Sequence, residues 1–437
     1  MIRILQISSI VIFTSLFCFP FFFSFLPSVN TKMFLAVLGL LVFPLEYING
    51  RIPTFKDSFQ KLSLWALGVS FFSFLSMTIN NTPDDSYLGY IISMWVWLFA
   101  AYFCVFLMRQ VHGEVSVETV GYYLVAVALL QCTLALLIDH FSFLKTMVDT
   151  YVTGEKYMGV GVEDRLYGIG CALDVGGGRL GAILVILAYL ILQSIKRQKS
   201  RWVFAGLLGA FFYILVIGNM MGRTTTVGAA IAIAYLIFSL CSDQKIEAAS
   251  IRSFLSTAGL VIIIGVIVCV GLYNVSPEMH KLLRFGFEAF FNFFEHGTFE
   301  THSTNMLSEG LIFPDNFKTW IIGDGYMASG SNDPYYIGPA DYGFYMNTDA
   351  GYSRFLFYFG LTGLVTFMLF FVNVCKECSQ KVKNTGLLFT ALLLLNFCIW
   401  IKVSTDIFVV FAPFLCLAAS GNEDDDDEVK DKELAEA

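Results

Sequence analysis

Charged residues are scarce in this chain. Asp, Glu, Lys and Arg make up 14% of its 437 residues, against about 25% in typical soluble proteins. Hydrophobic residues make up 57% and aromatic residues 16%. This balance excludes an ordinary soluble domain, and we expect no nucleic-acid partner.

Several cofactor motifs are also missing. The sequence contains no P-loop, no G-x-G-x-x-G nucleotide fingerprint and no H-E-x-x-H metal motif. His and carboxylate residues do not cluster beside the arginines discussed below. The sequence therefore predicts no ATP site, no cofactor and no metal.

The ten cysteines are scattered and form no disulfide framework. Cys375 and Cys378 lie in one C-K-E-C sequence, but a structural zinc site usually needs four ligands and no second pair lies nearby. Chance spacing is the better interpretation.

Long apolar runs recur along the whole chain. About 20 apolar residues span a bilayer as a helix, and runs of this length do not fit the alternating strands of a barrel. We therefore predict an all-α polytopic integral membrane protein. The expected spans, about twelve, cover 4–27, 31–48, 62–79, 88–108, 119–139, 179–195, 203–218, 224–241, 254–273, 353–373, 386–402 and 404–420.

The orientation follows from the basic residues of the short loops. Lys and Arg gather in alternate loops, such as the one holding Lys196, Arg197, Lys199 and Arg201, whereas N-N-T-P-D-D-S-Y on the other side has none. The positive-inside rule makes the basic side cytoplasmic. Both termini are then expected in the cytoplasm, and the first span is too long for a typical cleaved signal peptide.

The expected domain organisation is one transmembrane domain over residues 1–420. Two long loops, about 140–178 and 274–352, would both be extracytoplasmic. Residues 421–437 form an acidic tail that supplies most of the net charge of −8. Such a like-charged run is expected to be a disordered cytoplasmic end.

Isolated arginines lie at the predicted outer membrane boundary. Arg165 and Arg179 bracket a glycine-rich part of the first loop, and Arg223 lies in a very short outer connection. Anchoring of helix ends at lipid headgroups explains Arg179 better than Arg165. Because Arg223 runs against the positive-inside bias, a specific anionic partner and an anchoring role are equally open interpretations of it.

The second loop holds an aromatic-rich stretch and then a polar one. Residues 280–295 predict a helix in the membrane interface. The polar part contains His302 and Asp349, and it ends near Arg354. Its composition suits a sugar-binding loop and an ordinary exported loop equally well.

Three patches resemble the Wzy-type O-antigen polymerases and, more broadly, the O-antigen ligase superfamily. Arg165 and Gly176 match the R-x10-G pattern of such polymerases. M-G-R-T-T-T around Arg223 is similar to a short Gly-Ser-Arg-type turn. T-D-A-G-Y-S-R-F-L-F-Y-F-G-L-T-G-L, beginning at Thr348, looks like the segment that leads into the tenth span.

One departure favours a polymerase over a ligase. Ligases tend to carry a His-Asn-x-x-Leu signature, with a catalytic histidine, before the corresponding span. Here that place has Asp349 and Tyr352. Because His302 lies in the same loop and could fold back, a ligase stays an alternative.

The resemblance implies a metal-independent, GT-C-like glycosyltransferase at the outer face of the bacterial inner membrane. It would join undecaprenyl-diphosphate-linked repeat units into O-antigen, capsule or exopolysaccharide by an inverting displacement. The implied partners are the lipid-linked glycan donor and acceptor, membrane lipids, and a chain-length regulator and flippase of the same pathway.

The implied chemistry needs few residues. Arginine stays protonated and pairs with phosphate through two parallel hydrogen bonds, so Arg165 and Arg223 would stabilise the leaving diphosphate. Asp349 is the first candidate for the base that orients the acceptor hydroxyl. The candidate substrate-binding residues are Arg179, Gly176, Glu163, His302, Tyr352 and Arg354.

A transporter or flippase is the alternative from another class. Transporters place functional polar groups near the bilayer midplane and often show repeated halves. The sequence shows no internal repeat, and most spans lack central charges. Lys402 and Asp406, near the last connection, are the evidence in favour of transport.

Overall fold

The computed structural model describes residues 2–48, 56–153, 165–242, 246–301, 310–328 and 343–418. Nine helices in these ranges are long and apolar enough to cross a membrane. They are α2 (Thr31–Ile48), α3 (Lys56–Asn80), α4 (Tyr90–His112), α5 (Val117–His140), α7 (Leu173–Lys196), α8 (Arg201–Met221), α9 (Thr224–Ser242), α10 (Ala248–Val275) and α15 (Gly351–Lys381). The chain is therefore an all-α, multi-pass membrane protein.

Three further apolar helices are shorter, and two of them differ in extent from the expected spans. α1 (Ile2–Cys18) and α16 (Gly386–Lys402) have 17 residues each, and α17 (Phe408–Leu415) has eight. α1 ends well before residue 27 because Pro20 disfavours helical backbone at the residue before it. α17 rises only about 12 Å, so the described part of the expected span 404–420 does not form a spanning helix of its own.

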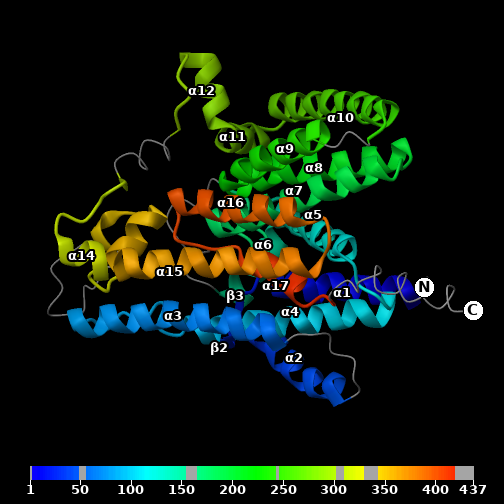
Figure 1. The fold of residues 1–437 in the computed structure, drawn as a ribbon. Coiled ribbons are helices and arrows are strands. Elements are labelled where there is room, and N and C mark those ends of the chain that lie inside the picture. Colours follow the sequence, from blue (N-terminus) through cyan, green and yellow to red (C-terminus); the bar gives the residue numbers. More distant parts are fainter. Residues whose placement is uncertain are drawn as a thin grey trace, which may run out of the picture.

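α7 forms the centre of the helix bundle. Of its most apolar 18-residue stretch, 94% is buried inside the protein, against 6% for α10 at the periphery. Figure 1 shows α10 and α2 on opposite sides of the bundle. α10 is apolar all round and exposed, as expected of a helix that faces lipid.

Two glycines let α7 and α9 pack closely. A Cβ atom on Gly228 would lie 2.2 Å from the Cα atom of Gly181. Small residues at helix crossings allow such backbone contact in membrane proteins. This contact holds the start of α9 against the first turns of α7.

A small antiparallel sheet ties the end of α1 to the first loop. β1 (Phe22–Phe23) pairs with β2 (Leu26–Asn30) and with β3 (Val152–Thr153), in the order β2-β1-β3. β3 follows α6 (Ser142–Tyr151), a short helix of the first loop. The sheet therefore joins segments that lie far apart in the sequence.

The described part of the second loop contains three short α-helices and the 3-10 helix Tyr345–Asn347. α11 (Pro277–Gly286) and α12 (Glu288–His296) are followed by α14 (Phe317–Ile322). The expectation of one helix over 280–295 is wrong, because the backbone leaves helical geometry at Phe287 (ψ 28°). Figure 1 shows α12 and α14 at the opposite end of the bundle from the labelled termini.

α15 is broken near its start, which the sequence did not predict. At Gly360 the backbone has φ 65° and ψ −171°, so the helix is interrupted there. A Cβ atom at Gly360 would lie 2.3 Å from the carbonyl carbon of Ile321 in α14. Hydroxyl groups of α3 bind the break: Ser76 donates to the carbonyl oxygen of Tyr358 (2.6 Å) and Ser73 bonds the Tyr358 hydroxyl (2.7 Å).

Candidate functional site

The candidate site lies at the end of the bundle where α7, α9 and α15 begin and α8 and α16 end, which we call the loop end. The backbone N–H of Leu166 donates to the carbonyl oxygen of Met220 (3.0 Å), which fixes Arg165 against the last turn of α8. Arg223 follows that turn directly and precedes Thr224, the first residue of α9. The two arginines thus come together although they are distant in sequence.

Both arginines lie against one aromatic ring. The guanidinium carbons of Arg165 and Arg223 are each 4.8 Å from the centroid of the Phe285 ring in α11. Arg223 also forms an ion pair with Glu288 of α12, and the exposed fractions of these two side chains are 14% and 27%. Among the described residues, Arg165 has no ion-pair partner. Two guanidinium groups therefore lie beside one directly bonded carboxylate.

Burial and charge repulsion act on Arg223. Loss of solvent lowers its pKa, the neighbouring Arg165 lowers it further, and Asp174 raises it. A guanidinium stays protonated despite such shifts. The arrangement is therefore a half-buried dication that an anion with more than one charge would stabilise.

A second ion pair lies beside the dication. Lys402 Nζ, in the last turn of α16, is 2.7 Å from Asp174 Oδ1, in the first turn of α7. Both charges suit the dipoles of their helices. The Thr224 hydroxyl also donates to Asp174 Oδ1 (3.2 Å). Asp174 was not predicted, because it and Lys402 are 228 positions apart and no local sequence pattern reveals the pair.

Asp349 is near this ion pair, just before α15. Burial raises the pKa of its carboxyl group above the ordinary value, with a smaller contribution from Asp174. A backbone hydrogen bond, Lys402 and Arg354 lower that pKa. A carboxylate whose pKa is raised toward the working pH suits a general base.

Two of the predicted substrate-binding residues make contacts within the protein. Arg354 donates to the Ser404 hydroxyl (2.6 Å) and to the Met327 carbonyl oxygen (2.9 Å). The Tyr352 hydroxyl donates to the carbonyl oxygen of Phe397 in α16 (3.1 Å). These contacts join α15 to its neighbours.

Arg179 and Gly176 do not join the arginine pair. Arg179 donates to the Cys18 carbonyl oxygen (2.8 Å), toward α1, and its guanidinium carbon is 5.6 Å from the ring of Trp97. A Cβ atom at Gly176 would meet the Sγ atom of Cys171 at 3.1 Å. The R-x10-G glycine therefore supports local backbone packing. Two other predicted residues, Glu163 and His302, lie outside the described residues.

In the described ranges, His, Cys, Asp and Glu form no group of three or more that could hold a metal ion.

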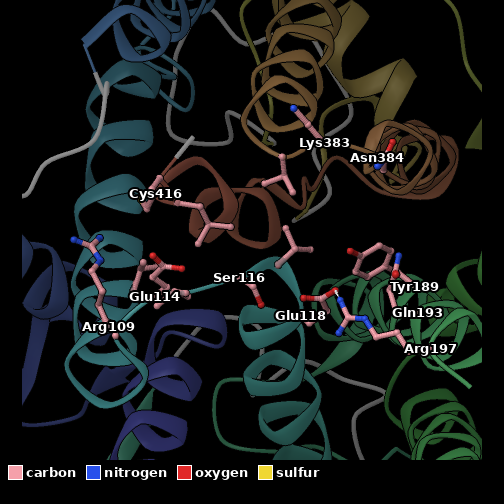
Figure 2. Close-up of a pocket in the computed structure, with 17 residues that line it drawn as sticks. Arg109, Glu114, Ser116, Glu118, Tyr189, Gln193, Arg197, Lys383, Asn384 and Cys416 are labelled. Carbon is pink, nitrogen blue, oxygen red and sulfur yellow. Dashed lines mark hydrogen bonds and ion pairs between the residues drawn. The ribbon is translucent and has the colours of Figure 1, made fainter. Parts of the chain in front are cut away.

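A cavity of about 800 Å³ lies at the opposite end of the bundle. Figure 2 shows polar side chains that line it, from α4, α5, α7 and the α15–α16 connection. Arg197 and Glu118 form an ion pair there (2.7 Å), and Arg109 binds Glu46 at the same distance. The cavity reaches Tyr189, more than one turn inside α7.

No protein-family model, curated protein or solved structure matches this chain.

Proposed function

We propose that this protein is a membrane glycosyltransferase that joins undecaprenyl-diphosphate-linked repeat units into a polysaccharide. The observation that carries the proposal is the pair Arg165 and Arg223 on the Phe285 ring, where Glu288 is the one carboxylate that binds the pair directly among the described residues. A diphosphate carries more than one negative charge and accepts several hydrogen bonds from two guanidinium groups.

In the proposed reaction, the acceptor's sugar hydroxyl oxygen attacks the anomeric carbon of the donor sugar. The bond from that carbon to the phosphate oxygen breaks, and its electron pair leaves with undecaprenyl diphosphate. Arg165 and Arg223 stabilise the charge that builds on this leaving group. Asp349 takes the hydroxyl proton, and the attack from the opposite face inverts the anomeric centre.

Glu288 is part of this proposal because its carboxylate forms an ion pair with Arg223. A diphosphate that binds Arg223 has to replace or share the Glu288 carboxylate. Glu288 lies on α12, a short helix of the second loop that presents exposed phenylalanines such as Phe294 (83% exposed). Arrival of the lipid-linked donor would therefore move α12.

The proposed setting is the outer face of a bacterial inner membrane, with both termini in the cytoplasm. The Lys and Arg bias of the loops supports this orientation. The arginine pair then faces the side where lipid-linked repeat units are polymerised. The energy of the donor linkage drives the reaction, so no ATP is needed.

The lipid-linked glycans of a deletion strain test the proposal. Loss of a polymerase should leave single repeat units on undecaprenyl diphosphate. Finished polymer left on the same carrier would indicate a ligase instead, and repeat units confined to the cytoplasmic leaflet would indicate a flippase.

Two observations favour transport as the second candidate function. α15 is discontinuous at Gly360, and broken helices form the binding sites of many transporters. The cavity of about 800 Å³ at the opposite end provides a vestibule for a solute. A transporter would move a labelled lipid-linked glycan across a vesicle membrane without extending it, whereas the polymerase would extend it.

A further inference from the structure

The loop end contains a second pair of cations on one aromatic ring. Lys32 Nζ lies 4.1 Å from the centroid of the Trp97 ring, and the guanidinium carbon of Arg179 lies 5.6 Å from it. The arrangement repeats that of Arg165 and Arg223 on Phe285.

The second pair is fixed by regular helices. The Thr31 hydroxyl, at the first residue of α2, donates to the Leu16 carbonyl oxygen in α1 (2.8 Å). Arg179 in α7 donates to the carbonyl oxygen of Cys18, the last residue of α1 (2.8 Å). The end of α1 therefore holds Lys32 and Arg179 together, and Trp97 of α4 completes the group.

Anchoring at lipid headgroups explains one cation over a tryptophan, but it does not explain two. Lys32 is in the first turn of α2, where the helix dipole disfavours positive charge. Arg179 is in the second turn of α7. The charges of Lys32 and Arg179 also repel each other, and the carboxylate of Asp406 partly offsets this repulsion at Lys32. An anion with more than one charge would relieve this repulsion.

The two cation pairs lie on either side of α7. Asp174, beside the first pair, and Arg179, in the second, are five residues apart, so their side chains leave the helix in directions about 140° apart. The end of α16 and the α16–α17 connection also link the two places. Lys402 binds Asp174, and Asp406 acts on Lys32.

We propose that Lys32, Arg179 and Trp97 form a second diphosphate site, which holds the lipid-linked acceptor while Arg165 and Arg223 hold the donor. This inference rests on the proposed function, in which two lipid-linked substrates react. The acceptor keeps its own diphosphate, and only the donor's sugar–phosphate bond breaks.

The side chains suit these different tasks. The donor site has two arginines, whose planar groups match a leaving diphosphate as its charge develops. The acceptor site has one arginine and one lysine, and a point charge is sufficient where no charge develops.

The test counts bound lipids by native mass spectrometry of the purified protein, with undecaprenyl diphosphate as the probe. The unaltered protein should bind two molecules. A variant with Lys32→Gln and Arg179→Gln should bind one, as should a variant with Arg165→Gln and Arg223→Gln. The molecule that remains in each variant shows that the protein is folded.

Polymer synthesis by the same samples completes the test. The Lys32→Gln, Arg179→Gln variant should lose about tenfold or more of its polymerisation rate, since charge-assisted hydrogen bonds to the acceptor are lost. The matched control is Lys318→Gln. It alters an exposed lysine of α14 whose Nζ atom is 3.3 Å from Asp324 Oδ1. It should bind two lipids and polymerise normally.

Several results would overturn the second site. They are one bound lipid in the unaltered protein, two in the Lys32→Gln, Arg179→Gln variant, or normal polymerisation by that variant. Displacement of the second lipid by excess phosphatidylglycerol would make the site a phospholipid anchor. If the unaltered protein binds no lipid diphosphate and makes no polymer, the proposed function itself fails.

Discussion

At the residue scale, the proposed catalysis depends on the two-pronged geometry of Arg165 and Arg223. Lysine keeps the positive charge and the reach of arginine but loses the planar fork that binds two phosphate oxygens. We expect Arg165→Lys and Arg223→Lys each to shorten the glycan markedly, with roughly a tenfold or greater loss of polymer. The measurement is glycan chain length in a complemented deletion strain, normalised to the amount of protein in the membrane.

Arg284→Lys is the matched control for these two variants. Arg284 lies one residue before Phe285 and forms two hydrogen bonds of 2.7 Å with Glu295 on the protein surface. Its replacement should leave the glycan unchanged. Full-length polymer from both Arg165→Lys and Arg223→Lys would indicate that the two arginines only anchor helix ends at the membrane surface.

Asp349 gives a prediction for pH dependence. A base works only when deprotonated, and burial raises the pKa of Asp349, so activity should fall with decreasing pH sooner than an ordinary carboxyl group would allow. Lys402→Met removes a charge that lowers this pKa and should move the acid limb of the kcat/KM profile to higher pH. If the acid limb is the same in Lys402→Met and in the unaltered protein, Asp349 is not the base. An active Asp349→Asn variant would exclude it as well.

At the scale of elements, the sequence predicts most helices but not their interruptions. Apolar runs indicate α2 and α16 at both ends, and α3 to α5 and α7 to α10 to within six residues at each end, because span length depends on bilayer thickness. The break at Gly360 depends on α14, which fills the space beside it from a distant part of the chain. The amino-acid composition around Gly360 does not reveal such a contact.

The candidate site is only partly visible in the sequence for the same reason. Arg223 is conspicuous because a basic residue in a short outer connection opposes the charge bias of the loops. The charge bias of the loops does not single out Phe285, Asp174 or Lys32. Their roles appear only when α11, α7 and α2 are packed together.

Packing of α7 against α9 should be sensitive to one methyl group. Gly228→Ala would force its Cβ atom into the backbone of Gly181, and overpacking of this kind costs about 1–3 kcal/mol. We expect a lower thermal unfolding temperature in detergent. Gly206→Ala in α8 is the control, because no heavy atom lies within 4 Å of its added Cβ. Equal unfolding temperatures for both variants would mean that α7 and α9 are not packed as described.

At the scale of the whole molecule, the proposed function requires the loop end to face outward. Reporter fusions after Tyr151 and after Gly297 should both report an extracytoplasmic position, and a fusion after Gly113 should report the cytoplasm. The physical reason is the surplus of Lys and Arg in the loops at the other end. A cytoplasmic signal at Tyr151 or Gly297 would place the arginine pair on the wrong side of the membrane.

The most direct test of the central claim is polymer synthesis by the purified protein from lipid-linked repeat units in excess EDTA. In the proposed mechanism, arginines stabilise the leaving diphosphate and no metal takes part. We expect a ladder of polymer that lengthens with time, together with release of free undecaprenyl diphosphate. The absence of a ladder, or a ladder that forms only when magnesium or manganese is restored, would contradict this mechanism.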